Sequence, residues 1–275
     1  MTCAWQELLS ILPPWLRPQV DGYRDSLQEL RLRAGQPPQL ILRDGTMWLS
    51  REVGTEDLNF CVNTASRYSP WAARSAAMGY ITAPGGHRIG LCGDAVMQND
   101  VMTGIRTATS LCIRVARDFP GIAEKYTMIT GSVLIIGPPG SGKTTFLRDL
   151  ICQISIREPI SVVDERRELF PVGYFHRGKA LDVLHDCPKS AGINLLLRTM
   201  GPAVIAVDEI TAADDCEAMM TAGWCGVRLL ATAHASAVSD LRSRSLYRPL
   251  VQTNLFSHIL VLDRNKTIHE ERMTL

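Results

Sequence analysis

The hydrophobic and polar residues in the first part of the chain follow the patterns of strands and turns. Gln28–Arg33 alternates polar with apolar residues, as a half-buried strand does, and a second apolar run indicates the returning strand. Asp44-Gly45 favours a hairpin turn. The expected elements are strands at 28–33, 40–42 and 47–49, helices at 55–67 and 69–78, and short strands separated by glycines from 81 to 116. This mixture predicts an α+β module.

The pattern changes after the turn at 119–121. Short, fully apolar runs now alternate with helical spacing, beginning with a run at 132–136 and a helix at 144–154. Further buried strands are expected at 160–163, 203–207, 228–231 and 259–262. Apolar strands that alternate with helices predict a parallel sheet covered on both faces. We place the boundary between residues 118 and 130, with domains at 1–120 and 121–275.

Composition excludes several classes of protein. The 275 residues include 29 basic and 28 acidic side chains, so net charge gives no indication of a nucleic-acid or membrane-surface partner. The eight cysteines are scattered without a Cys-x-x-Cys pair, which indicates free thiols in a reducing cytosol rather than a zinc site. No apolar run approaches the roughly 20 residues of a membrane span, and the N-terminus lacks the pattern of a signal peptide. We therefore expect a cytoplasmic protein that reaches any membrane through a partner.

The clearest chemical signal is a glycine-rich loop between an apolar run and a helix. It matches the pattern Gly-x-x-x-x-Gly-Lys-Ser/Thr, in which glycines let backbone N–H groups point at phosphate oxygens. The start of the following helix adds its positive end. Lys143 is expected to reach the β and γ phosphates, and the Thr144 hydroxyl to bind Mg²⁺. The loop comprises Gly137, Pro138, Pro139, Gly140, Ser141, Gly142, Lys143, Thr144 and Thr145.

A second signal is the acidic pair that ends the apolar run at 204–207. Asp208 is placed to hold Mg²⁺ beside the phosphate loop, and Glu209 is placed to polarise an attacking water. Considered alone, an Asp-Glu pair after an apolar strand is also compatible with ordinary surface residues at the end of that strand. An adjacent Asp-Glu pair favours hydrolysis by a motor over phosphoryl transfer by a small-molecule kinase. ATP and Mg²⁺ are therefore the expected ligands.

Two further strand ends carry polar groups, and in a parallel sheet all these ends meet at one edge. Asp164 or Glu165 is a candidate to orient water or magnesium, with a solvated charge cluster as the alternative. Thr232 and His234 follow the strand expected at 228–231. His234 is a candidate sensor of the γ-phosphate, although a lone histidine is often structural.

Arginines are the expected source of a cation delivered by a neighbouring subunit. Such a cation stabilises the charge of the phosphoryl transition state. Four arginines lie in the first module or near the linker, and most arginines are simply surface residues. The four are Arg88, Arg106, Arg114 and Arg117, of which Arg106 and Arg114 are the candidates for a catalytic role.

The four strand-end motifs, in this order and behind an α+β module, resemble the traffic ATPases of type II and type IV secretion. The resemblance identifies 137–145 with their Walker A loop and Asp208-Glu209 with their Walker B motif. It also identifies Asp164-Glu165 with their Asp box and 232–234 with their His box. The order Asp-Glu at 164–165, where the superfamily commonly has Glu-Asp, leaves open which acid acts in catalysis.

A closer resemblance, to the stage III sporulation protein AA family, covers nearly the whole chain. The stretches that carry it are 29–37, 84–90, 182–189 and 198–202, which secretion ATPases in general do not share. It implies an ATPase of the mother cell in an endospore-forming bacterium. Such an ATPase would energise the channel to the forespore together with membrane proteins of that channel.

From these observations we expect a RecA-like P-loop ATPase domain of the α/β class, preceded by a smaller α+β domain. We expect it to form a homo-oligomer, a hexameric ring in which arginines from a neighbour complete each site. The alternatives are a nucleic-acid-stimulated motor and an ATP-binding assembly switch without turnover. The sequence gives the first little support, because it has no basic stretch interleaved with aromatic residues. A metabolite kinase is a more distant alternative.

Overall fold

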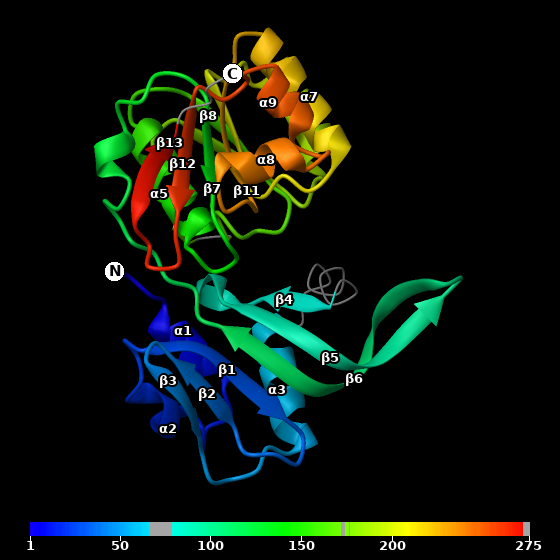
Figure 1. The fold of residues 1–275 in the computed structure, drawn as a ribbon. Coiled ribbons are helices and arrows are strands. Elements are labelled where there is room, and N and C mark those ends of the chain that lie inside the picture. The colour runs from blue at the N-terminus through cyan, green and yellow to red at the C-terminus, as the bar shows by residue number, and fades with distance from the viewer. Residues whose placement is uncertain (67–78, 172–173, 176, 272–275) are drawn as a thin grey trace. The chain divides into compact units, whose positions relative to one another are not determined.

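The computed structural model describes residues 1–66, 79–171, 174–175 and 177–271. Two compact units divide the chain, Met1–Asp118 and Phe119–Leu275, and each is described by itself (Figure 1). The helix expected at 69–78 lies outside the described residues. Among the described residues, no helix combines the length and the apolar character that crossing a bilayer requires.

The N-terminal unit is an antiparallel sheet with helices, as an α+β module should be. Its strands pair in the order β3-β2-β1-β6-β5-β4. One apolar core joins the sheet to the helices, with Trp5, Leu30 and Leu58 among its buried members. The elements are α1 (Trp5–Ile11), α2 (Arg17–Asp21), β1 (Leu27–Arg33), β2 (Gln39–Leu42), β3 (Gly45–Trp48), α3 (Thr55–Ser66), β4 (Tyr80–Thr82), β5 (Arg88–Gln98) and β6 (Val101–Arg114).

The long β5–β6 hairpin differs from the short, glycine-separated strands expected at 81–116. Gly90, Gly93 and Gly104 lie inside the strands, and the ladder shifts register between Cys92 and Gly93, as at a β-bulge. A Cβ at Gly93 would lie 1.9 Å from the Thr107 carbonyl oxygen, so glycine is needed for this close backbone approach. A glycine in a strand pattern therefore marks a bulge here rather than the end of the strand.

The C-terminal unit contains a mostly parallel sheet with strand order β13-β12-β7-β11-β10-β8-β9. Within the described part of this sheet, only the β12–β13 pair is antiparallel. The strands are β7 (Val133–Ile136), β8 (Ile160–Asp164), β9 (Leu181–His185), β10 (Val204–Val207), β11 (Arg228–Ala233), β12 (His258–Leu262) and β13 (Ile268–Glu271). The helices are α5 (Lys143–Ile154), α6 (Lys189–Thr199), α7 (Ala213–Trp224), α8 (Val238–Ser243) and α9 (Arg248–Gln252).

Successive residues of the central strands enter two separate cores, one on each face of the sheet. On β7, Leu134 and Ile136 pack in the core formed with α6, α7, α8 and α9. Val133 and Ile135 pack in the core formed with α5. Burial on both faces explains why β7 and β10 are fully apolar. The arrangement leaves the carboxyl ends of β7, β8, β10 and β11 at one edge of the sheet, where the polar motifs of the sequence follow.

Candidate nucleotide-binding site

The glycine-rich loop connects β7 directly to α5, as its sequence predicts. Gly140 and Gly142 have φ of 76° and 100°, a left-handed backbone that L side chains rarely adopt. A Cβ at Gly137 would lie 2.3 Å from the Leu262 carbonyl oxygen, so this position also excludes a side chain. Ser141 Oγ is buried without a hydrogen-bond partner among the described residues. The loop thus has the backbone shape of a phosphate cradle and an unsatisfied polar group inside it.

Lys143, the first residue of α5, folds back over this loop. Its Nζ donates hydrogen bonds to the carbonyl oxygens of Gly137 at 2.9 Å and Pro138 at 3.0 Å. Burial lowers the pKa of Lys143, and the carboxylates of Asp208 and Glu209 oppose that effect. The ammonium group is therefore held at the loop by contacts that a phosphate oxygen would replace.

Asp208 meets the start of α5 from the end of β10. Thr144 Oγ1 donates to Asp208 Oδ2 at 2.8 Å, and Thr232 Oγ1 donates to Asp208 Oδ1 at 2.7 Å. The Glu209 N–H donates to Thr232 Oγ1 at 2.8 Å. The ends of β10 and β11 are thus joined to the phosphate loop, and a hydroxyl and a carboxylate lie side by side. These are oxygen ligands of the kind that Mg²⁺ prefers.

A hydrogen-bonded chain links the lysine to the second acid. Lys143 Nζ lies 3.1 Å from His234 Nδ1, and His234 Nε2 lies 2.9 Å from Glu209 Oε1. Because an ammonium group only donates, Nδ1 accepts, and Nε2 carries the proton that it donates to Glu209. Glu209 has a φ of 37°, an uncommon backbone conformation for glutamate. His234 therefore orients Glu209 in this structure.

Asp164 is used differently from its neighbour Glu165. Its carboxylate is buried and accepts backbone N–H groups from Glu168 at 2.9 Å, Leu169 at 3.2 Å and Phe170 at 2.8 Å. Burial raises the pKa of Asp164, and the N–H donors of Phe170 and Leu169 oppose that rise. This geometry favours a structural role, in which Asp164 holds the loop after β8. The catalytic role expected for Asp164 stays a prediction that these contacts do not favour.

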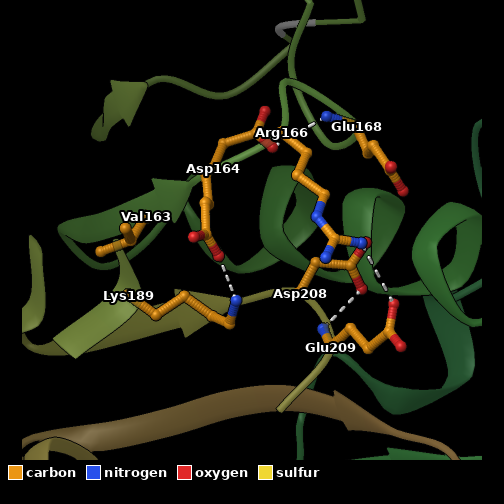
Figure 2. Close-up of a pocket in the computed structure, with 8 residues that line it drawn as sticks. Val163, Asp164, Arg166, Glu168, Lys189, Asp208 and Glu209 are labelled. Atoms are coloured by element: carbon orange, nitrogen blue, oxygen red, sulfur yellow. Dashed lines mark hydrogen bonds and ion pairs between the residues drawn. The ribbon is translucent and has the colours of Figure 1, made fainter. Parts of the chain in front are cut away.

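The acidic strand ends surround a small pocket, shown in Figure 2. Arg166 extends over the acids, with its guanidinium 4.0 Å from Glu209 Oε2, and Lys189 points to the acidic end of β8. The lining residues are Val163, Asp164, Glu165, Arg166, Glu168, Lys189, Asp208 and Glu209. The structure therefore brings both acidic pairs of the sequence into one pocket.

Two cations of this pocket, Arg166 and Lys189, were not among the site residues expected from sequence. Arg166 directly follows Asp164 and Glu165, and the sequence gives it no role beyond the alternative of a solvated charge cluster. Lys189 ends a stretch that carries the family resemblance, but its spacing from the strand-end acids gives no signal of a contact. Arg106 and Arg114 lie on β6 in the other unit, where Arg114 Nε is 3.7 Å from Glu29 Oε2.

The chain is similar to known proteins over most of its length. A model of the family described as sporulation stage III, protein AA matches residues 10–272. Stage III sporulation protein AA of Bacillus subtilis (strain 168) is 36% identical over 258 residues, covering 87% of this chain and 83% of that protein. This likeness spans both units.

Solved structures share the fold at low sequence identity. The Legionella pneumophila ATPase DotB has a TM-score of 0.60 and 17% identity, and the match covers 89% of this chain and 73% of that one. The pilus retraction motor PilT, solved with bound ADP, has a TM-score of 0.59 and 14% identity, and the match covers 88% and 76%. The fold class expected from sequence, an α/β unit of the RecA-like type found in secretion ATPases, is thereby confirmed.

Proposed function

Because the chain belongs to the stage III sporulation protein AA family, we propose that it is a magnesium-dependent ATPase acting as a secretion-type motor in sporulation. The B. subtilis relative is named for sporulation, and the fold is that of the ATPase DotB and the motor PilT. Family and fold suggest the class of protein, and the contacts at the sheet edge supply the chemical argument.

The hydrogen bond between Thr144 Oγ1 and Asp208 Oδ2, at 2.8 Å, carries the proposal. The two residues are 64 positions apart, and the fold brings a hydroxyl and a carboxylate together beside the phosphate loop. Thr144 and Asp208 are the proposed Mg²⁺ ligands, and 137–145 is the proposed ATP cradle. ATP, when bound, supplies the γ-phosphoryl group that is hydrolysed.

Glu209 is the proposed general base for the attacking water. Its contact with His234 Nε2 fixes the direction of the carboxylate, and the same imidazole contacts Lys143. Movement of Lys143 from the loop carbonyls to a phosphate would remove its contact with His234. His234 is therefore proposed to report phosphate binding to Glu209, and Glu165, which lines the same pocket, is proposed to assist.

Several finer features of the function also remain proposals. We propose that the chain forms a homo-oligomeric, hexameric ring, with Arg106 or Arg114 supplied in trans to the phosphates. We propose further that the ring works in the mother-cell cytoplasm, on integral membrane proteins of the sporulation channel. Light scattering with and without nucleotide tests the ring, and a monomer under both conditions would contradict it.

Steady-state ATP hydrolysis tests the central proposal. We expect magnesium-dependent turnover by the wild type. In Glu209→Gln it should fall by at least about a hundredfold, since a general base contributes that much. Lys143→Ala should lose ATP binding together with turnover. The matched controls are Glu217→Gln and Lys179→Ala, which change exposed residues of the same unit.

The same assay separates the alternatives that the sequence left open. Turnover that rises on addition of DNA or RNA would favour a nucleic-acid motor. Tight ATP binding without turnover in the wild type would favour an assembly switch. Turnover that persists in both Lys143→Ala and Glu209→Gln would contradict the proposed site.

A further inference from the structure

Lys189 is a buried cation to which the proposed chemistry assigns no role. It is the first residue of α6, and the residue is only 5% exposed. Its ammonium group pairs with the Glu165 carboxylate and lies 3.9 Å from Asp215 Oδ2. Removing an ammonium group from water is costly unless opposite charges surround it. The contacts therefore show why Lys189 is tolerated at this position, but not what it does there.

Stability alone is a weak explanation for this ion pair, in which Lys189 is buried and the Glu165 side chain is 36% exposed. Replacing such a pair by apolar side chains of similar volume is often neutral or stabilising, because desolvation offsets the attraction. Lys189 also lines the acidic pocket, together with Asp208 and Glu209. The ammonium group of Lys189 in this pocket is better explained by its effect on the positions of the neighbouring carboxylates.

Lys189 connects the two acidic strand ends. On one side it holds Glu165, in the loop that follows β8. On the other side it lies beside Asp215, whose Oδ2 accepts the N–H groups of Thr211 and Ala212, each at 3.1 Å. That backbone comes shortly after Glu209 and leads into α7, which begins at Ala213. One ammonium group thus contacts the segment after β8 and the side chain that organises the segment after β10.

We propose that Lys189 is a positioning residue for ATP hydrolysis, which holds the Glu165 carboxylate in the pocket that Glu209 also lines. This inference rests on the proposed ATPase function. Lys189 acts through Glu165, whereas the proposed contacts of the phosphates are Lys143 and the glycine-rich loop. Loss of Lys189 should therefore lower kcat and leave the affinity for ATP nearly unchanged.

The test compares Lys189→Met, Glu165→Gln and the double variant by kcat and by the Kd of a fluorescent ATP analogue with magnesium. Lys189→Met should lower kcat by about tenfold to a hundredfold, which is the size of rate loss that a misplaced catalytic group causes. Its Kd should change by less than about threefold, because ground-state binding is separate. The double variant should be no slower than Glu165→Gln alone. Lys179→Met is the matched control, since that lysine is exposed.

The outcomes distinguish this inference from the proposed function. A wild type without hydrolysis would refute the ATPase function and this role with it. An active wild type with Lys189→Met at wild-type kcat would overturn the positioning role alone, as would two kcat losses that multiply in the double variant. If circular dichroism shows that Lys189→Met does not fold, Lys189→Arg replaces it in both backgrounds. Its kcat loss should vanish in the Glu165→Gln background, and a loss that persists there overturns the proposal.

Discussion

Gly192 in α6 offers a quantitative test of how closely this helix packs on the sheet. A Cβ at Gly192 would lie 2.6 Å from Val163 Cγ1, 2.9 Å from Val163 Cγ2 and 3.2 Å from Leu184 Cδ2. The first two distances are shorter than real contacts, and valine is stiff at χ1, so Val163 has little freedom to turn away. Accommodating the methyl group requires that the helix or the strand move.

Two opposing effects set the size of the change in Gly192→Ala. Alanine is favoured over glycine inside a helix by about 1 kcal/mol. Overpacking of a well-filled core costs typically about 1–3 kcal/mol, and two contacts below 3.0 Å place this site at the upper end. We therefore expect a net loss of about 2 kcal/mol in the free energy of unfolding. Urea denaturation followed by circular dichroism measures this loss.

Gly223 in α7 is the matched control. A Cβ there would meet mainly Leu255 Cδ1, at 2.4 Å, the end of a flexible side chain that can rotate aside. Gly223→Ala should therefore be nearly neutral in the same assay. A Gly192→Ala protein as stable as the wild type would refute the close packing of α6 on β8. Since α6 begins with Lys189, that result would also undermine the contact with Glu165.

Two further predictions concern titration and thiol reactivity. Burial lowers the pKa of His87, so the unfolded chain binds a proton more readily than the folded one, and unfolding free energy should fall as pH drops below about 6.5. Calorimetry from pH 7 to pH 5 should show a smaller decline for His87→Gln, and an unchanged decline would contradict the neutral, buried His87. Burial also raises the pKa of Cys61 to about 12 and of Cys216 to about 11, whereas Cys92 and Cys225 are exposed. A maleimide should therefore label Cys92 and Cys225 first. Mass spectrometry locates the label, and rapid labelling of Cys61 in the native protein would refute its burial.

Local sequence was sufficient wherever the physical cause is local. The apolar run at 132–136 precedes a glycine-rich loop and a helix, and β7 and α5 occur there because all three signals act within about 20 residues. The expected strands at 160–163, 203–207, 228–231 and 259–262 correspond to β8, β10, β11 and β12. Strand β9 was not expected, because Leu181–His185 mixes polar and apolar residues as an edge strand with partial exposure does.

The residues of the candidate site also divide into those that the sequence predicts and those that it does not. The phosphate loop, Thr144, Asp208, Glu209 and His234 were expected from motif and order, since parallel strands must end at one edge of their sheet. Their mutual contacts follow that rule. The sequence did not separate the roles of Asp164 and Glu165, because adjacent acids look alike until their partners are known.

Only the tertiary structure decides which partner each charged group finds. Asp164 turns into the protein and accepts three backbone N–H groups, while Glu165 pairs with Lys189, 24 residues away. Hydrophobic periodicity records which face of an element is buried, whereas the meeting of two distant side chains depends on how whole elements pack. The sequence alone therefore determined which types of side chain lie at this sheet edge. The packing of α6 against β8 decided which charges would meet there.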